Sequence, residues 1–222
     1  MDARETERIK AHIKKYDTGF TVYVPALTKA SVLIPLLMKN REIHVLMTLR
    51  SLKLRSGAGE VCFPGGKYDP QDRDEIATAL REAEEEIGLP PDKVEVIGKL
   101  LPILNKNGLL ITPVVGLIDG TFEANPNPEE VSGVFTVPLD YFLSQTNHSF
   151  FKASYLPFRV HSFWYLDAAS NNEYHIWGLT ALLAITVAVL VYRRKPMFEV
   201  DFDPEDPLSY FQHNFQLGLS KL

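Results

Sequence analysis

The segment 65–89 constrains this chain more than any other, because it predicts a helix with two chemically opposed faces. The first face is an apolar stripe at helical spacing, made of Ile76, Leu80, Ala83 and Ile87. The second face gathers Glu82, Glu85 and Glu86, whose side chains converge within one helical turn. The two faces lie roughly 140° apart at about 100° per residue. We therefore expect one side of the helix to pack on a core and the other to expose carboxylates.

Three converging carboxylates repel one another, so a face of this kind is either solvated or neutralised by a ligand. Hard divalent cations prefer oxygen ligands, and Mg²⁺ pairs one or two carboxylates with the phosphates of a substrate. For an acidic run taken alone, a solvated surface is the commoner outcome. The residues that flank the helix change this balance.

Arg81 to Leu89 read RE-A-E-EE-I-G-L, and Gly66 supplies a glycine upstream. This string resembles the Nudix box, G-x5-E-x7-R-E-U-x-E-E-x-G-U, so the chain is identified as a member of the Nudix hydrolases. The resemblance implies an α/β (α+β) fold, the Nudix fold, with a mixed β-sheet sandwiched between helices. It also implies that Arg81 ties the helix to a neighbouring acid, and that Mg²⁺ or Mn²⁺ is held by Glu82, Glu85 and Glu86.

The motif departs from the Nudix pattern at its first acid. The segment between Gly66 and Arg81 is one residue too long, and no glutamate stands where the pattern requires one. Three aspartates in this segment are candidates to replace it: Asp69, Asp72 and Asp74.

Residues 46–66, LMTLRSLKLRSGAGEVCFPGG, precede the box. They are similar to the signature of the coenzyme A diphosphatases within the Nudix group, L-L-T-x-R-[SA]-x3-R-x3-G-x3-F-P-G-G, with Met47 in place of one leucine. Coenzyme A carries a diphosphate and a 3′-phosphate, and guanidinium and ammonium groups recognise such anions. The predicted substrate-binding residues are Arg50, Ser51, Lys53, Arg55, Gly59, Phe63 and Lys67.

The resemblance implies metal-dependent hydrolysis of the diphosphate bond of coenzyme A and acyl-CoA esters, giving 3′,5′-ADP and (acyl-)4′-phosphopantetheine. Water attacks one phosphorus and the other phosphate leaves. The expected catalytic residues are Glu82, Glu86 and Glu130, with Glu130 as the first candidate for the general base and Glu82 as the alternative. Two other functions stay open: a Nudix hydrolase for another dinucleotide, such as NADH or ADP-ribose, and a degenerate, non-catalytic domain that binds acyl-CoA.

The 222 residues are most simply one domain with appendages. We expect residues 1–29 to form an N-terminal extension with a short amphipathic helix loosely tied to the domain, 30–195 the Nudix domain, and 196–222 a tail.

A net charge of −5 without a basic tract argues against nucleic acid as a partner. The single cysteine, Cys62, excludes an internal disulfide, and its apolar neighbours predict a buried, structural role.

Apolar, β-branched runs predict strands that form hairpins around short polar turns. The acidic helix is expected to end at Gly88, because Pro90 and Pro91 follow. A short strand and then a helix are expected at 134–145. The other predicted strands are 31–38, 43–48, 94–104, 109–118, 161–167 and 173–176.

Residues 176–192 form an uncharged run that is just long enough to cross a membrane. Gly178, Thr180 and Thr186 interrupt its apolar character, and it continues directly from a predicted strand. We therefore expect the buried last helix of the domain and no membrane span.

The final tripeptide, Ser220-Lys221-Leu222, is the address read by the peroxisomal import receptor. The N-terminus has no apolar region of the kind found in secretory signals. These features predict a location in the peroxisomal matrix, and coenzyme A and acyl-CoA as the substrates met there.

Overall fold

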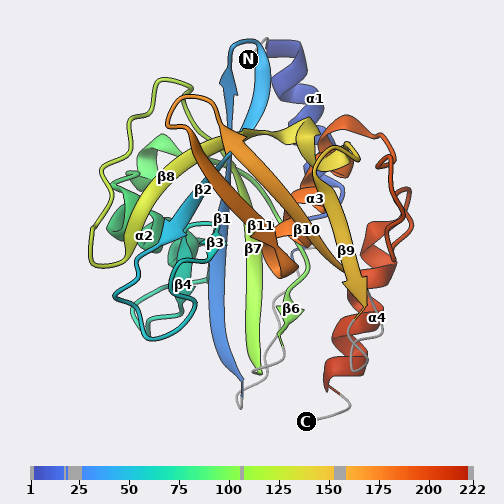
Figure 1. The fold of residues 1–222 in the computed structure, drawn as a ribbon. Helices are drawn as coiled ribbons and strands as arrows, with labels where there is room; N and C mark the ends of the chain where they lie inside the picture. The colour runs from blue at the N-terminus through green and yellow to red at the C-terminus, as the bar shows by residue number, and fades with distance from the viewer. Residues whose placement is uncertain (1–2, 18, 20–26, 106–107, 153–158, 220–222) are drawn as a thin grey trace.

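The computed structural model describes the chain except for residues 1–2, 18, 20–26, 106–107, 153–158 and 220–222 (Figure 1). The polar segment 105–108 between the predicted strands 94–104 and 109–118 falls partly outside the described residues, and the terminal tripeptide falls wholly outside them. The helices are α1 (Ala3–Lys14), α2 (Glu75–Ile87), α3 (Gly178–Tyr192) and α4 (Pro207–Leu219), with short 3-10 turns at Pro91–Lys93 and Leu139–Leu143. The strands are β1 (Thr28–Lys39), β2 (Glu42–Arg50), β3 (Val61–Cys62), β4 (Gly65–Lys67), β5 (Glu95–Lys99), β6 (Ile103–Leu104), β7 (Leu109–Leu117), β8 (Val131–Pro138), β9 (His148–Lys152), β10 (Arg159–Asp167) and β11 (Asn172–Trp177).

The long strand β1 organises an eight-stranded mixed sheet. It pairs antiparallel with β2 and parallel with β7, in the strand order β3-β2-β1-β7-β5, while β4, β6 and β8 pair with β1, β7 and β2. The parallel pairing of β1 with β7 makes the sheet mixed, as predicted. The turn between β1 and β2 consists of Asn40 and Arg41, both with positive φ (53° and 67°), which suits a two-residue hairpin.

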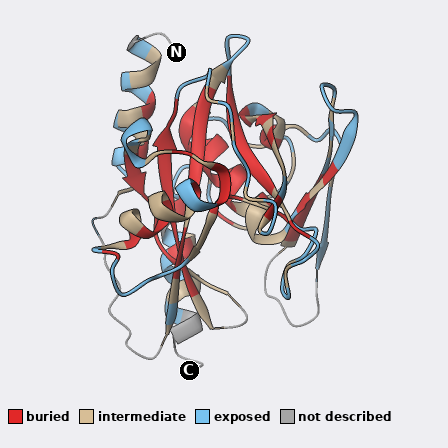
Figure 2. Ribbon diagram, turned by 90° about the vertical axis from the view of Figure 1, so that its left-hand side faces the viewer, coloured by how far each residue is buried: buried red, intermediate tan, exposed pale blue. Residues whose placement is uncertain are grey.

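The main sheet carries a hydrophobic core on each face, because the side chains of β1 alternate between them. Leu33 and Leu37 join the cluster under α2, whereas Ile34 and Leu36 join the larger cluster that contains α3. Figure 2 shows the buried residues running along the central strands and α3. The helices therefore lie on both faces of the sheet, which confirms the predicted layered fold.

A second, three-stranded antiparallel sheet has the order β11-β10-β9. The hairpin of β10 and β11 was predicted, but β9 was not. Tyr174 of β11 stacks on Phe135 of β8 with ring centroids 3.6 Å apart, so the small sheet packs directly against the main one.

Helix α3 is a core helix, as the sequence predicted. Ten of its fifteen residues, from Ala181 to Val191, are buried. Among the described residues, no helix is long and apolar enough to cross a membrane. A further helix, α4, follows in the tail, and Phe202 and Phe211 of this region are buried. Ion pairs of Arg159 with Glu199 and Asp201 also hold the tail against β10.

The N-terminal helix α1 is an integral part of the core, so the prediction of a loose attachment was wrong. Ile9 and Ile13 are fully buried, and α1 packs against β5 and α3. A Cβ atom at Gly98 of β5 would lie 2.7 Å from the Ile13 side chain, so this glycine permits the close approach. Lys10 adds an ion pair with Glu95 at 2.6 Å.

We predict that Ile13→Ala lowers the free energy of unfolding by about 2–4 kcal/mol, because it leaves a cavity between α1, β5 and α3. Lys14→Ala, which alters an exposed neighbour on the same helix, serves as the control and is expected to cost less than about 0.5 kcal/mol. Urea unfolding curves of both variants measure the difference. Equal midpoints would mean that α1 contributes nothing to the core.

Candidate active site

Helix α2 is fixed at both ends by residues that suit those positions. The Asp74 side chain accepts a hydrogen bond from the Ala77 backbone N–H at 2.7 Å and so caps the N-terminus. Gly88 ends the helix with a left-handed φ of 67°, as predicted. Asn125 and Asn127 then donate their backbone N–H groups to the carbonyls of Ile87 and Glu86, both at 2.9 Å. The loop 125–130 is therefore anchored to the last turn of α2.

Glu86 is the most buried of the three predicted metal ligands, with 3% of its surface exposed. Its carboxylate accepts a hydrogen bond from the Gly65 N–H at 3.1 Å. Burial raises its pKa to about 7, and the negative charges of Glu82 and Glu130 add to this shift, while Gly65 and the Arg50 guanidinium oppose it. These electrostatic effects show that the carboxylates of Glu82, Glu86 and Glu130 share one region.

Glu82 lies directly under the tight turn that precedes α2. A Cβ atom at Gly66 would lie 2.4 Å from the Glu82 carboxylate carbon, so only glycine leaves room for this side chain. A Cβ atom at Gly65 would lie 2.3 Å from the Ser31 carbonyl oxygen of β1. Burial raises the pKa of Glu82 as well, although Arg81 opposes the shift. The two glycines, which lie in β4, therefore let this short strand pair with β1 and lie against the acidic face of α2.

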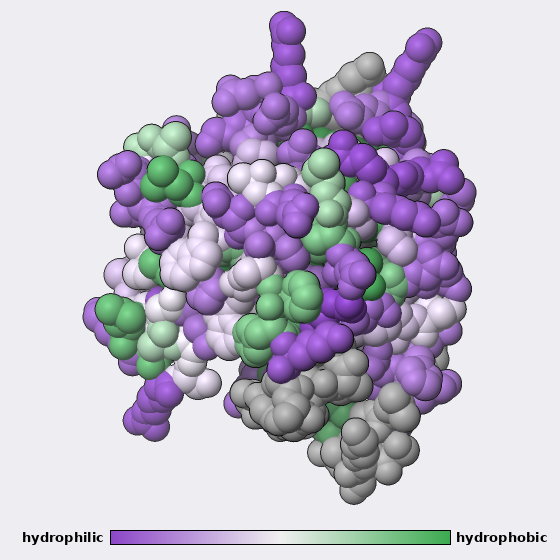
Figure 3. Space-filling model, turned by 45° about the vertical axis from the view of Figure 1, so that its right-hand side comes forward, coloured by the Kyte–Doolittle hydropathy of each residue, from purple (hydrophilic) through white to green (hydrophobic). Residues whose placement is uncertain are grey.

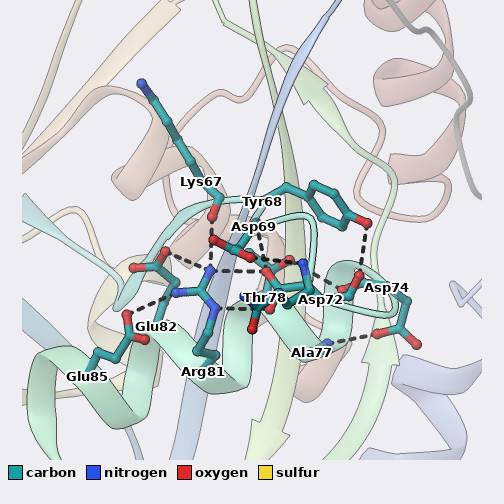
Figure 4. Close-up of polar contacts among 11 residues, drawn as sticks. Lys67, Tyr68, Asp69, Asp72, Asp74, Ala77, Thr78, Arg81, Glu82 and Glu85 are labelled. Carbon is teal, nitrogen blue, oxygen red and sulfur yellow. Dashed lines mark hydrogen bonds and ion pairs between the residues drawn. The ribbon is translucent and has the colours of Figure 1, made fainter.

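Arg81 gathers the acidic groups around this turn (Figure 4). Its guanidinium binds Asp72 through two contacts, Nε to Oδ1 at 2.9 Å and Nη2 to Oδ2 at 3.0 Å. It also donates to the Lys67 carbonyl at 3.0 Å and pairs with Glu82 and Glu85 at 3.0 and 2.9 Å. The Arg81 hydrogen bonds lower the pKa of Asp72 to about 2 and raise that of Arg81. The predicted tie between Arg81 and a neighbouring acid is confirmed.

The three aspartates proposed for the missing first acid have different roles. Asp72 is nearly buried, and its carboxylate is held by Arg81 and by the Asp69 backbone N–H at 2.9 Å. Asp74 caps α2, and the Asp69 side chain accepts from the Gln71 N–H at 2.8 Å. Of the three, Asp72 is the acid that supports the Nudix arginine.

The predicted substrate loop contacts the loop 125–130. Ser51 is buried, donates its hydroxyl to the Pro128 carbonyl at 3.3 Å, and donates its backbone N–H to the Glu130 carbonyl at 2.8 Å. Lys53 pairs with Glu129 at 2.5 Å. Ser51 and Lys53 therefore join the two loops, and their contact with a substrate stays a prediction.

The other predicted substrate residues differ widely in exposure. The Arg50 guanidinium donates a hydrogen bond to the Ser56 carbonyl at 3.4 Å. Its positive charge also lowers the pKa of Glu86, which indicates that it lies near the carboxylates. Arg55 and Lys67 are exposed, whereas Phe63 is a core residue with 2% exposure. Gly59 has a left-handed φ of 74° and donates its N–H to the Arg50 carbonyl. Phe63 therefore supports the loop from below.

The family model of the NUDIX domain matches residues 27–158, which is more than half of the chain. The chain belongs to the Nudix family. It is 44% identical over 217 residues to the mouse protein named "Peroxisomal coenzyme A diphosphatase NUDT7", covering 96% of this chain and 92% of that relative. It is 41% identical over 175 residues to "Nudix hydrolase 15, mitochondrial" from Arabidopsis thaliana, covering 77% of this chain and 61% of the relative.

A solved structure of a C. elegans Ap4A hydrolase binary complex is 18% identical, covers 52% of this chain and 82% of its own, and gives a TM-score of 0.44. A MutT/nudix family protein from Enterococcus faecalis is 13% identical, covers 100% of this chain and 94% of its own, and also gives a TM-score of 0.44.

Nudix hydrolases generally need divalent metal ions, and the carboxylates of this Nudix chain fit that need. Glu82 and Glu86 offer oxygen donors, and the negative charge of Glu82 raises the pKa of Glu86, so a cation beside them would relieve the repulsion. In the described part of the chain, no group of three or more acidic, histidine or cysteine side chains already has a metal-holding arrangement. Arg81 pairs with Glu82 and Glu85 instead, and the Glu85 side chain is 54% exposed.

Asn127 is a positioning residue that sequence analysis missed. Its side-chain amide donates to Glu130 Oε1 at 3.4 Å, and its Oδ1 accepts from the Glu129 N–H at 3.1 Å. The signal was present, because asparagine commonly forms such a turn with the backbone two residues on. Asn127 thereby fixes the loop that carries Glu130.

We predict that Asp72→Asn lowers the stability of this Nudix domain by roughly 1–2 kcal/mol at neutral pH, after allowance for solvent screening. The pKa of Asp72 is depressed in the folded state, so its contribution is present above about pH 4 and is lost as the pH falls toward 2. Thermal unfolding between pH 2 and 7 measures this effect, with Asp69→Asn as the control. An unchanged acid transition in Asp72→Asn would contradict the assignment.

Proposed function

We propose that this chain hydrolyses the diphosphate bond of coenzyme A and acyl-CoA esters, releasing 3′,5′-ADP and (acyl-)4′-phosphopantetheine. One observation carries the proposal: the basic loop (residues 50–60) is fastened to the loop that carries Glu130, because the Ser51 N–H donates to the Glu130 carbonyl at 2.8 Å, and the positive charge of Arg50 favours the ionised form of the buried Glu86. A cationic group suited to phosphate therefore lies beside carboxylates suited to a divalent cation. The name of the mouse relative, a coenzyme A diphosphatase, supports the same substrate.

In this proposal the protein contributes a carboxylate cluster, a phosphate clamp and a base. Glu82, Glu85 and Glu86 would hold Mg²⁺ or Mn²⁺, which when bound neutralises charge that develops on the diphosphate. For Glu85 this requires release from Arg81, whose guanidinium keeps its contacts with Asp72. Arg50 binds and orients the diphosphate from the opposite side.

Glu130 is the proposed general base, which takes a proton from the attacking water. Its negative charge raises the pKa of both Glu82 and Glu86, which indicates that it lies near them. Its position on a loop fastened to α2 and to Ser51 holds it against the cluster. Glu82 is the alternative base, and its contact with Arg81 in this structure makes it the less available of the two.

Recognition of the 3′-phosphate is assigned to the exposed end of the basic loop. Arg55 is exposed there, and Lys53 is held by a single surface ion pair with Glu129 that a phosphate can replace. Gly59 belongs to the same loop, Lys67 is a further candidate on β4, and Ser51 and Phe63 fix the shape of the loop. The loop therefore provides both charge and a defined backbone.

We also propose a location in the peroxisomal matrix, with import through Ser220, Lys221 and Leu222. The name of the mouse relative supports this location. Fusing the last residues of the chain to a fluorescent protein and replacing Leu222 in a matched fusion tests the address directly. Diffuse fluorescence from both fusions would contradict it.

The decisive test of the reaction is mass spectrometry of coenzyme A incubated with the protein and Mg²⁺, with and without chelator, in ¹⁸O water. We expect chelator-sensitive release of 3′,5′-ADP and 4′-phosphopantetheine, with the label showing which phosphorus is attacked. Faster turnover of NADH or ADP-ribose would favour a different Nudix substrate. Binding of acyl-CoA without cleavage would instead favour a non-catalytic sensor.

We predict that Glu86→Gln lowers turnover by about 10²-fold or more while leaving the fold intact, because it removes the most buried oxygen ligand. Glu84→Gln changes an exposed glutamate on the same helix and is the matched control. Steady-state rates, with circular dichroism as the check on folding, measure the effect. Undiminished activity in Glu86→Gln would overturn the assignment of this ligand.

We predict that Arg55→Gln reduces the preference for coenzyme A over dephospho-CoA about tenfold, because one charge-assisted hydrogen bond to the 3′-phosphate is lost. Turnover of dephospho-CoA should change little. Lys93→Gln, an exposed cation outside the loop, is the control. A preference that stays the same in Arg55→Gln would place 3′-phosphate recognition elsewhere.

A further inference from the structure

A second concave region lies away from the carboxylates, where the C-terminal ends of α1 and α3 meet the segment that leads into α4. This cleft has a volume of about 560 Å³. Helices α1 and α3 lie on the face of the main sheet that does not carry α2 (Figure 1). We call it the basic cleft, after the five basic residues that line it: His12, Lys15, Arg193, Arg194 and Lys195.

The charge of the basic cleft is poorly balanced by the protein itself. Glu205 is the one acidic residue in its lining, and it pairs with Lys195 at 3.5 Å. No carboxylate in the described part of the chain forms an ion pair with Lys15 or Arg193. The whole chain carries a net charge of −5, so this concentration of positive charge runs against its overall composition. Figure 3 shows hydrophilic side chains dominating the upper part of the side on which α1 lies.

Cations at helix C-termini have an ordinary explanation, because they complement the helix dipole. One basic residue after each helix would be enough to complement the two dipoles, whereas five basic residues line the cleft. Arg193 also has a left-handed φ of 51° directly after α3, a position where glycine is the least costly residue. The chain thus places an arginine where backbone conformation alone favours glycine, which indicates a role for its side chain.

His12 lines the basic cleft and responds to the charge around it. Its Nδ1 atom is buried and has no hydrogen-bond partner within the described structure. Burial lowers the pKa of His12, and the positive charges of Arg193 and Lys15 lower it further. An anion in the cleft would oppose the part of this shift that the charges of Arg193 and Lys15 cause.

The floor of the basic cleft is apolar and includes one aromatic ring. Tyr16, Val189 and Leu190 line it beneath the charged rim. An apolar surface beside convergent polar groups, in a volume of roughly 300–1,000 Å³, is typical of small-molecule sites. A nucleoside has the matching character, because its base is flat and its phosphates are anionic.

We propose that the basic cleft is a second binding site, which takes a soluble organic phosphate of nucleotide size. The phosphate groups bind Lys15 and Arg193, and the base lies against Tyr16. Phospholipid headgroups offer the same phosphate chemistry, but the concave shape favours a free ligand over a flat membrane. The inference does not depend on the proposed reaction, because none of these residues belongs to the carboxylate site.

The test uses 3′,5′-ADP as the probe and His12 as the local reporter. NMR titration of the full chain, in the presence of chelator, follows the His12 ring signals, which the spectrum of His12→Gln identifies. We expect saturable shifts and a raised pKa of His12, because a bound anion stabilises the imidazolium. Unchanged His12 signals at saturating probe would overturn the proposal, even if the probe binds at the carboxylate site.

Charge-reversal variants locate the binding energy. Lys15→Glu with Arg193→Glu is expected to weaken the His12 response about tenfold or more, whereas Lys14→Glu with Lys93→Glu makes the same change in net charge outside the cleft and should alter it less than about twofold. If the first pair unfolds, Lys15→Gln with Arg193→Gln replaces it. Equal weakening in both pairs would reduce the effect to net charge. Binding to phosphatidylserine vesicles with no response to 3′,5′-ADP would also overturn the proposal.

Discussion

The close approach of the turn at Gly65 and Gly66 to helix α2 is the contact on which the rest of the site depends. Both glycines lie in β4, which pairs with β1, and any side chain at either glycine would strike the Ser31 carbonyl or the Glu82 carboxylate. Gly65 in turn donates its N–H to Glu86. The side chains of Glu82 and Glu86 are thereby held largely away from solvent, and this burial raises the pKa of both.

Arg81 and its buried partner Asp72 stabilise this arrangement. The guanidinium offsets the charge of Glu82 and Glu85, and the bidentate contact with Asp72 fixes its plane. A divalent cation at the cluster would compete with Arg81 for Glu82 and Glu85. In the proposed metal site, binding of the cation and release of these glutamates would therefore be coupled.

The remaining parts of the chain hold this site from the outside. Ser51 and Asn127 fasten the basic loop and the loop that carries Glu130 to one another and to α2. On the other face of the sheet, α1, α3 and the small sheet complete the core under β1 and β2. The C-terminal ends of α1 and α3, with the segment that leads into α4, form the basic cleft. One sheet therefore supports two chemically opposite surfaces, an acidic cluster under the turn and a basic cleft at the helix ends.

The sequence by itself determined the local features. Spacing of three and four residues placed Glu82, Glu85 and Glu86 on one face of α2, and Gly88 ended the helix, because both effects act within a few residues. The alternating strands and the burial of the uncharged run 176–192 could also be predicted from the sequence. Only the tertiary structure decided which aspartate holds Arg81, that Ser51 and Phe63 support the loop from within, that Ile9 and Ile13 belong to the core, and that α4 packs through Phe202 and Phe211. Each of these depends on contacts between segments far apart in the chain, where local pattern carries no information about the partner.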